Sequence, residues 1–272
     1  MAAEPGISII VTVKNEEERI GQFLESLRHQ EMPFEVVIVD SDSVDRTREI
    51  VLGISEVLPL NYIRMNCSRG KGRNMGAKES RYPYLLFLDG DCIADSNLLH
   101  NLRKYIADGY NLIAGKTVLI GPERFSKLNR VTLFLDNFEV TSPSSNLCYD
   151  KSMFEDIKGF NEIMVTAEDI DLNIRAIRYG ARAAMSQDCL VKGFTRQTLR
   201  TFLKQGFWNG YGRGQLRLIH RKDWNGIRKG QIIGKRWTAY NFLRLSFGLC
   251  GYLYAILKRG KYPGNLEKAL KN

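Results

Sequence analysis

Two carboxylates separated by one glycine are the residues of this chain best suited to chemistry. Asp89, Gly90 and Asp91 directly follow residues 84–88, an apolar run typical of a buried strand. Carboxylates at the end of such a strand can hold Mg²⁺ or Mn²⁺ against a phosphate, because these cations prefer hard oxygen ligands and leave room for a substrate diphosphate. The competing interpretation is a solvated turn, since Asp-Gly-Asp is also a common turn composition.

The segments around this pair alternate between strand and helix patterns. Strands are expected at residues 7–13, 35–40, 60–64, 84–88 and 110–120, and helices at residues 16–29, 45–53, 97–107, 151–157 and 166–180. The Gly-rich, basic residues 66–76 are expected to form a turn that leads into a further helix. This order predicts an α/β fold with a doubly wound, mostly parallel sheet, helices on both faces and nucleotide chemistry at the strand ends. Residues 121–150, with prolines and a Ser-rich turn, are expected to form a surface segment.

Charge is distributed unevenly along the 272 residues. Residues 192–272 contain 18 bases and 2 acids, a net charge of +16, whereas residues 1–191 contain 22 bases and 28 acids, a net charge of −6. This asymmetry predicts an anionic partner for a basic, helical C-terminal region. Residues 195–220 are expected to be helical but interrupted by four glycines.

Residues 237–257 form an apolar stretch whose only charge is Arg244, with bases on both sides. Its 21 residues can just span a bilayer, and its polar positions equally suit a helix lying at a membrane interface. An ordinary helix packed on the domain is the alternative.

The cysteines and the N-terminus indicate the compartment. Five cysteines, with no CxxC pair, argue against a disulfide framework or a zinc site. The N-terminus shows no secretory signal pattern, so the expected location is cytoplasmic, at the cytoplasmic face of a membrane. The histidines show no ligand spacing, and His29 and His100 are expected at the surface.

Six motifs occur in a specific order: IIVTVKNEE, VVIVDSDSVDRT, RGKGRNMGA, YLLFLDGDC, GFNE and AEDIDLNIRAIRYG. Together they resemble the family 2 glycosyltransferases with the GT-A fold, over about residues 7–190. The resemblance implies an inverting enzyme that moves one sugar from a nucleoside-diphosphate sugar to an acceptor hydroxyl, on a glycan or a polyprenyl-linked acceptor. It implies a catalytic domain at residues 1–191, followed by the basic region at 192–272.

The resemblance also assigns roles on the donor side. Asp40 would contact the nucleotide, with capping as its alternative role. Asp91 would coordinate the metal, and Asp89 would contact the ribose or a metal-bound water. The remaining donor-side positions are Thr12, Glu16, Arg69, Arg73, Gly90, Asn146 and Arg213. For Arg213, a charge facing lipid competes with a contact to the donor phosphates.

On the acceptor side the resemblance implies Asp169 as the base and Glu168 as an acceptor or sugar contact. A helix N-terminus favours the ionised carboxylate that a base requires. Capping is the alternative role for this pair, and Asp171 is expected to be a helix-surface acid.

Three departures from the family pattern matter. Val13 and Lys14 occupy positions where the family often has Pro and Tyr, so a uracil base in the donor is not implied. Residues 190–194, LVKGF, lack the histidine that serves some members as a third metal ligand. Residues 205–208 lack the arginine of the QxxRW motif of processive synthases, which favours transfer of one sugar at a time.

Two other functions remain open from the residues alone. A nucleotidyltransferase shares the strand order and the acidic strand ends, but residues 13–21 supply no Gly-rich phosphate loop. A nucleic-acid-binding protein could use the basic C-terminal third, where aromatic residues are interleaved with bases. That function would leave the acidic pairs unexplained, so nucleic acid is an unlikely partner.

Overall fold

The computed structural model describes residues 4–122, 131–195, 198–221, 224–230 and 239–258. The chain forms two compact units that interleave along the sequence. Unit 1 consists of Met1–Leu119, Ser142–Phe160 and Arg175–Phe194, and unit 2 of Ile120–Thr141, Asn161–Ile174 and Thr195–Asn272. The functional division expected at residue 191 stays a prediction.

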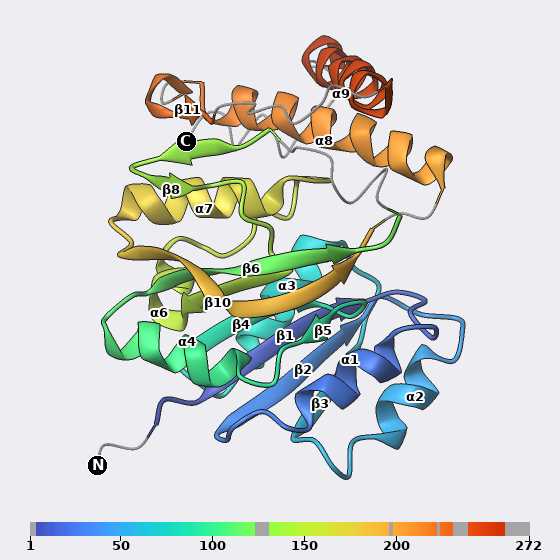
Figure 1. Cartoon of the computed structure of the whole chain (residues 1–272), viewed down its shortest axis with the longest axis vertical. Helices are drawn as coiled ribbons and strands as arrows, with labels where there is room; N and C mark the ends of the chain where they lie inside the picture. Colours follow the sequence, from blue (N-terminus) through green and yellow to red (C-terminus); the bar gives the residue numbers. More distant parts are fainter. Residues whose placement is uncertain (1–3, 123–130, 196–197, 222–223, 231–238, 259–272) are drawn as a thin grey trace. The chain divides into compact units, whose positions relative to one another are not determined.

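Unit 1 is built on an eight-stranded sheet with the order β3-β2-β1-β4-β9-β6-β10-β5 (Figure 1). The strands are β1 (Ile7–Val13), β2 (Phe34–Asp40), β3 (Leu60–Arg64), β4 (Tyr84–Asp89), β5 (Ile93–Ala94), β6 (Leu112–Ile120), β9 (Asn146–Asp150) and β10 (Ala183–Phe194). Strands β3, β2, β1 and β4 are parallel, whereas β9 runs antiparallel to both β4 and β6. The expected mostly parallel, doubly wound sheet is therefore confirmed, with β9 as an antiparallel strand within it.

Helices cover both faces of this sheet (Figure 1). They are α1 (Ile20–Leu27), α2 (Thr47–Gly53), α3 (Arg69–Lys78), α4 (Leu98–Ala107) and α6 (Lys151–Asp156). Leu86 and Leu88 of β4 belong to the core cluster that includes α1 and α4. Phe87, which points to the other face, packs its ring on Phe154 of α6. This alternation follows from the two-residue period of a strand, and it explains why β4 is apolar along its length.

Helix α3 begins earlier than the sequence predicts. Residues 66–76 were expected to form a turn, but the helix starts at Arg69, where the Ser68 hydroxyl accepts from the backbone N–H of Lys71. Its glycines serve packing: a Cβ at Gly72 would lie 2.8 Å from Thr12, and a Cβ at Gly76 would lie 2.5 Å from Ile10. These glycines let the helix backbone approach β1 closely, so they do not mark a loop.

The expected surface segment at residues 121–150 is also wrong in part. Residues 146–150 form β9, which lies between β4 and β6 and buries Leu147, Cys148 and Tyr149. In unit 2, β7 (Leu133–Leu135), β8 (Phe138–Glu139) and β11 (Arg228–Lys229) form a small antiparallel sheet. Turn-forming residues in this stretch separate short strands. Because the stretch is rich in Pro and Ser, its composition predicts a loop and does not indicate these strands.

Unit 2 contains the first half of α7 (Glu168–Tyr179), together with α8 (Leu199–Ile219), the 3₁₀ turn η1 (Trp224–Gly226) and α9 (Ala239–Leu257). The glycines expected to interrupt residues 195–220 lie within a continuous α8. They form a surface for α9: a Cβ at Gly210 would lie 1.8 Å from the carbonyl oxygen of Gly248. Helices α8 and α9 therefore pack with their backbones in contact, which only glycine allows.

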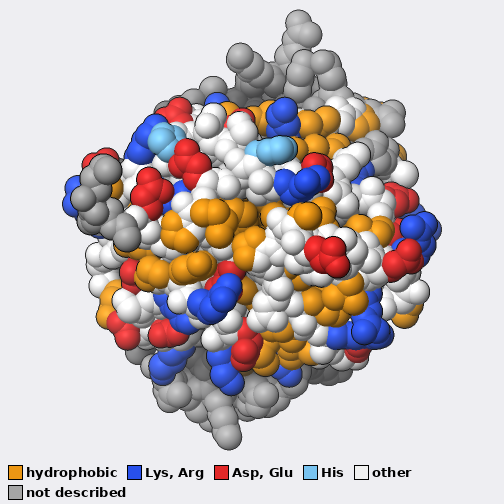
Figure 2. All heavy atoms as spheres, turned by 90° about the horizontal axis from the view of Figure 1, so that it is seen from below, with side chains coloured by type: hydrophobic (Ala, Val, Ile, Leu, Met, Phe, Trp, Pro, Cys, Tyr) orange, Lys and Arg blue, Asp and Glu red, His pale blue; other side chains and the backbone are white. Residues whose placement is uncertain are grey.

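Helix α9 covers most of the apolar stretch at residues 237–257, whose first two residues lie outside the described ones. Within the described part of the chain, no helix combines the length and apolar character that crossing a bilayer requires. Side chains of both charge signs lie among apolar ones on the face drawn in Figure 2.

Candidate active site

The parallel strands bring the predicted donor-side carboxylates to one edge of the sheet. In the register of β1 and β4, Thr12 is paired with Asp89, and in that of β1 and β2, Val13 is paired with Asp40. All these residues lie at the carboxyl ends of their strands, where open α/β sheets bind ligands. Sequence reasoning placed them there, and the structure agrees.

Arg73 and Asp89 form an ion pair at this edge. The guanidinium Nη2 of Arg73 donates to Oδ1 of Asp89 across 3.0 Å, and the Phe160 ring centroid lies 5.3 Å from the guanidinium carbon. The Arg73 side chain is 2% exposed, whereas that of Asp89 is 41% exposed. A fixed cation therefore stands beside the Asp-Gly-Asp turn. Arg69, also expected in a turn, is instead the exposed first residue of α3.

Gly90 allows the turn to pack against the sheet. A Cβ at this position would lie 2.7 Å from Cγ1 of Val13, so a larger residue would push the turn away from β1. Asp91 follows and is partly exposed. Burial, followed by the charges of Asp89 and Asp91, raises the pKa of the neighbouring Cys92 thiol well above its ordinary value. Cys92 is therefore held as a thiol and is no candidate nucleophile.

Asp40 is fully buried, and both of its oxygens accept hydrogen bonds. Oδ1 accepts from the backbone N–H of Ser43 at 2.8 Å, and Oδ2 accepts from the hydroxyl of Tyr62 at 2.5 Å. Burial and the bond to Asp40 raise the pKa of Tyr62 to about 12. Capping and the Tyr62 contact are thus both observed. Sequence reasoning missed Tyr62, because its contact with Asp40 depends on the pairing of Asp40 with Arg64 in β3.

The loops after β1 and β2 are interlocked at the same edge. The N–H of Glu16 donates to the Thr47 hydroxyl at 2.8 Å, and the N–H of Asn15 donates to the Ser43 hydroxyl at 2.9 Å. Asn15 and Asp42 have φ of 55° and 52°, a region that non-glycine residues adopt at a cost. This network fixes the chain around Thr12 and Glu16.

Asn146 lies in the sheet, away from open space. Its side-chain amide donates to the carbonyl of Cys189 at 2.9 Å, the residue is 1% exposed, and its amide fills the position that a Cβ of Gly115 would occupy. Asn146 thus bridges strands β9, β6 and β10, and the contact near the donor sugar that the resemblance implies stays a prediction.

The acidic residues at the start of α7 belong to unit 2. Glu168 is 5% exposed and Asp169 is partly exposed, and both lie in the first helical turn, where the helix dipole favours ionised carboxylates. Asp171 was expected at the helix surface, and this is wrong. It is 1% exposed and lies 2.8 Å from the buried ring of His220, a partner 49 residues away in the sequence.

Arg213 lies on α8, and its Nη2 donates to the carbonyl of Val131 at 2.5 Å. This bond ties α8 to the segment before β7 within unit 2. Arg213 as a whole is partly buried.

Comparison with known proteins now identifies the family. Residues 8–157, more than half of the chain, match the sequence profile of glycosyl transferase family 2. The chain belongs to glycosyltransferase family 2. The protein is therefore a glycosyltransferase, and this decides between the enzymatic and binding functions that the residues alone leave open.

Curated relatives cover most of the chain. Glycosyltransferase AglE of Haloferax volcanii is 26% identical over 80% of this chain and 76% of its own length. The O-antigen chain rhamnosyltransferase RfbN of Salmonella typhimurium is 24% identical over 75% of this chain and 71% of its own length.

Solved structures share the GT-A fold. TarS 1–349 of S. aureus, in complex with UDP-GlcNAc, matches with a TM-score of 0.64 at 19% identity, over 97% of this chain and 78% of that one. The mannosyltransferase PcManGT of Pyrobaculum calidifontis, in complex with GDP-Man and Mn²⁺, matches with a TM-score of 0.62 at 17% identity, over 99% and 79%. At these identities the likeness establishes the fold.

Proposed function

We propose that this family 2 glycosyltransferase moves a single sugar from a nucleoside-diphosphate sugar to an acceptor hydroxyl, with inversion at the anomeric carbon. The observation that carries the proposal is the buried Arg73 paired with Asp89 directly before Gly90 and Asp91. A fixed guanidinium suits a diphosphate, because it donates in a planar fork to phosphate oxygens. The nucleotide-sugar complexes of TarS and PcManGT support a donor of this class.

The donor would bind along the carboxyl edge of β1, β2 and β4. Asp40 would accept from the nucleotide, with Tyr62 fixing the carboxylate from the other side. Arg73 would face the diphosphate. The further donor-side residues are Thr12, Glu16, Arg69, Gly90 and Arg213. Asn146, which is as buried as Asp40 and Arg73, would lie near the donor sugar.

A divalent cation fits this edge only in partnership with the substrate. Among the residues that the structure describes, no three His, Cys, Asp or Glu side chains gather as a metal site. The protein would therefore supply Asp91 and, beside it, Asp89, which is the arrangement that Mg²⁺ or Mn²⁺ accepts when phosphates and water complete its shell. When bound, the cation would neutralise charge on the leaving diphosphate.

Asp169 is the proposed base. As an ionised carboxylate in the first turn of α7, it would take the proton of the acceptor hydroxyl, which then attacks the anomeric carbon from the face opposite the leaving nucleotide. Glu168 precedes Asp169 in the sequence and is buried, and it would contact the acceptor or the sugar.

Transfer and hydrolysis assays with a panel of UDP- and GDP-sugars test this function. We expect turnover of at least one donor, a fall of about 100-fold or more in Asp91→Ala and Asp169→Asn, and no change in the exposed control Asp108→Asn. NMR of the product should show the inverted anomer. No turnover of any donor, or unchanged rates in both variants, would contradict the proposal.

The acceptor side of the proposal includes an anionic membrane surface. One face of α9 packs on α8 through Arg244, Gly248 and Gly251, so the only charge within the helix faces α8. Burial lowers the pKa of Arg244. The opposite face carries an apolar stripe of side chains between 49% and 83% exposed, namely Phe242, Leu249, Leu253 and Leu257. Such a helix suits the headgroup boundary of a bilayer.

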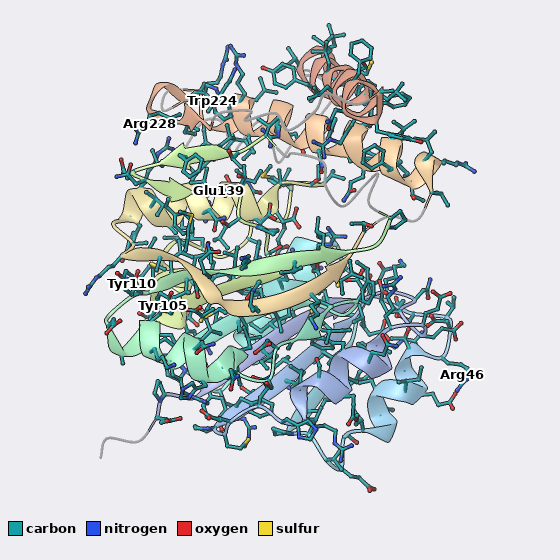
Figure 3. All side chains as sticks on the ribbon, in the orientation of Figure 1. Arg46, Tyr105, Tyr110, Glu139, Trp224 and Arg228 are labelled. Carbon is teal, nitrogen blue, oxygen red and sulfur yellow. The ribbon has the colours of Figure 1, made fainter. Side chains whose placement is uncertain are left out.

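Charge favours an anionic lipid surface over a second copy of this chain. Exposed bases follow residue 198 in the described part of unit 2, namely Arg200, Lys204, Arg217, Arg221, Arg228, Lys229 and Lys258. Arg228 points outward in Figure 3. No acid occurs among the described residues of this region, so two copies would repel each other while anionic headgroups would attract it. A lipid-linked acceptor, such as a polyprenyl-linked glycan, would then be presented at this surface.

Vesicle flotation tests the membrane proposal. We expect the protein to bind phosphatidylglycerol vesicles and to bind phosphatidylcholine vesicles more weakly. The double variant Leu249→Ser/Leu253→Ser should lose this binding. Val44→Ser, at an 88% exposed apolar position of unit 1, is the matched control. Equal binding by both variants would contradict the role of α9.

A further inference from the structure

A buried histidine and aspartate join the acidic start of α7 to the end of α8. Nε2 of His220 lies 2.8 Å from Oδ1 of Asp171, and their side chains are 7% and 1% exposed. His220 is the C-cap of α8, where its N–H donates to the carbonyl of Leu216. Because a buried carboxylate needs a hydrogen-bonding partner, this contact fixes the position of Asp171 against α8.

A second contact fixes the same end of α7. A Cβ at Gly212 of α8 would lie 2.8 Å from both the Cβ of Ala167 and Cγ2 of Thr166, so the backbone of α8 touches the residues that precede the helix. Ala167 has φ of 62°, in the left-handed region that disfavours a residue with a Cβ. A strained residue persists only where its surroundings hold it, and here α8 provides part of them.

A third contact lies one turn further along. The side-chain amide of Asn173, which is fully buried, donates to the carbonyl of Val140 at 3.0 Å. Asp171 and Asn173 thus anchor α7 to two different segments of unit 2. Two fixed points on the helix restrict its rotation about its own axis.

This rotation decides where Asp169 points. Residues two apart on an α-helix project about 200° apart and residues four apart about 40° apart, so holding both Asp171 and Asn173 fixes the direction of Asp169 as well. Asp169 is partly exposed, whereas Asp171 and Asn173 are buried. We propose that His220 is a positioning residue for the base Asp169, acting through Asp171; this inference rests on the proposed function.

Steady-state kinetics with the full chain test the inference. His220→Ala should lower kcat by about 10-fold or more, since small misplacements of a reacting group are costly, while the KM for the donor stays within about 2-fold. His220→Gln, which keeps a side-chain N–H for Asp171, should restore most of kcat. The matched control is His100→Ala, which removes a surface histidine 3.0 Å from Glu31.

Hydrogen exchange of the amides of residues 169–173 provides a readout that does not depend on activity. The inference is supported if these amides exchange faster in His220→Ala but slowly in His220→Gln and in the control. The kcat values should follow the same order, lowest in His220→Ala. A purely structural role would lower the melting temperature of His220→Ala without changing kcat below that temperature, and this result would overturn it. If Asp169→Asn keeps full activity, the proposed base and this inference both fail; if only His220→Ala keeps it, the inference alone fails.

Discussion

Arg73 donates to Asp89 from a buried guanidinium to a carboxylate that is 41% exposed. The two ends of this ion pair therefore differ in what happens when the other is removed. Without Asp89, a buried charge loses this carboxylate, whereas without Arg73 the carboxylate remains open to water. Removal of Asp89, which leaves the buried Arg73 charge without this partner, is therefore expected to destabilise the fold more than removal of Arg73.

Asp89→Ala should accordingly lower both the free energy of unfolding, by about 3 kcal/mol, and the turnover. Asp91→Ala should lower turnover alone, with a change in the free energy of unfolding below about 1 kcal/mol, because Asp91 is a partly exposed turn residue. Urea denaturation, combined with donor turnover, measures both effects. Equal stability losses in the two variants would show that the Arg73 contact does not stabilise the fold.

Tyr62 gives the donor edge a dependence on alkaline pH. Its pKa is about 12 because of burial and the bond to Asp40, above the value of 10 for a free tyrosine. A group whose pKa is raised by folding contributes stability that is present below pH 10 and lost as the pH rises through 12. In Tyr62→Phe, the decline in the free energy of unfolding between about pH 10 and 12 should be shallower than in the wild type.

The control for this measurement is Tyr110→Phe. The Tyr110 ring packs on that of Tyr105 at a centroid distance of 5.9 Å, away from the carboxyl ends of β1, β2 and β4 (Figure 3). This variant should show the wild-type slope. A wild-type slope in Tyr62→Phe as well would contradict the assignment of the alkaline loss to the Tyr62–Asp40 contact.

Strands β1, β2 and β4 of the parallel half could be predicted because they are buried on both faces. A run such as residues 36–39 of β2, every one of them buried, leaves a continuous apolar pattern that a sequence displays directly. The same strands carry Asp40 and Asp89 at their ends, so the donor edge followed from the strand order. Strand β9 was missed because its five residues are bounded by Asn146 and Asp150 and follow a Ser-rich turn, a composition typical of loops.

The remaining errors concern contacts between residues far apart in the sequence. The helix propensity of glycine predicts breaks in α8, but the close approach of α9 outweighs it. The residues around Asp171 in the sequence predict a surface acid, because its partner His220 is 49 residues away. Asp40 and Tyr62 lie on adjacent strands, and their contact depends on the register of β2 and β3, which a single sequence does not specify.

Glu35, at the opposite end of β2 from Asp40, gives the fold a dependence on acid pH. Burial acts to raise the pKa of its carboxyl, but hydrogen bonds from Ser8 and Arg81 outweigh burial and lower the pKa below 4.5. A depressed carboxyl contributes stability that is present above about pH 4.5 and lost as the pH falls through the folded-state pKa. Glu35→Gln should therefore be less stable at neutral pH and lose less stability on acidification. Thermal unfolding between about pH 3 and 7 checks this, and parallel curves for the two proteins would contradict it.

The contact between α8 and α9 should be sensitive to a single methyl group. Because a Cβ at Gly210 would lie 1.8 Å from the carbonyl oxygen of Gly248, Gly210→Ala must separate the two helices, at a cost of about 1–3 kcal/mol. Gly53→Ala is the matched control, since a Cβ there meets nothing within 4 Å and alanine is the better helix former by up to about 1 kcal/mol. Limited proteolysis should therefore cut α9 faster in Gly210→Ala and at the wild-type rate in Gly53→Ala. Wild-type protection of α9 in both variants would show that the glycine contact does not hold this helix.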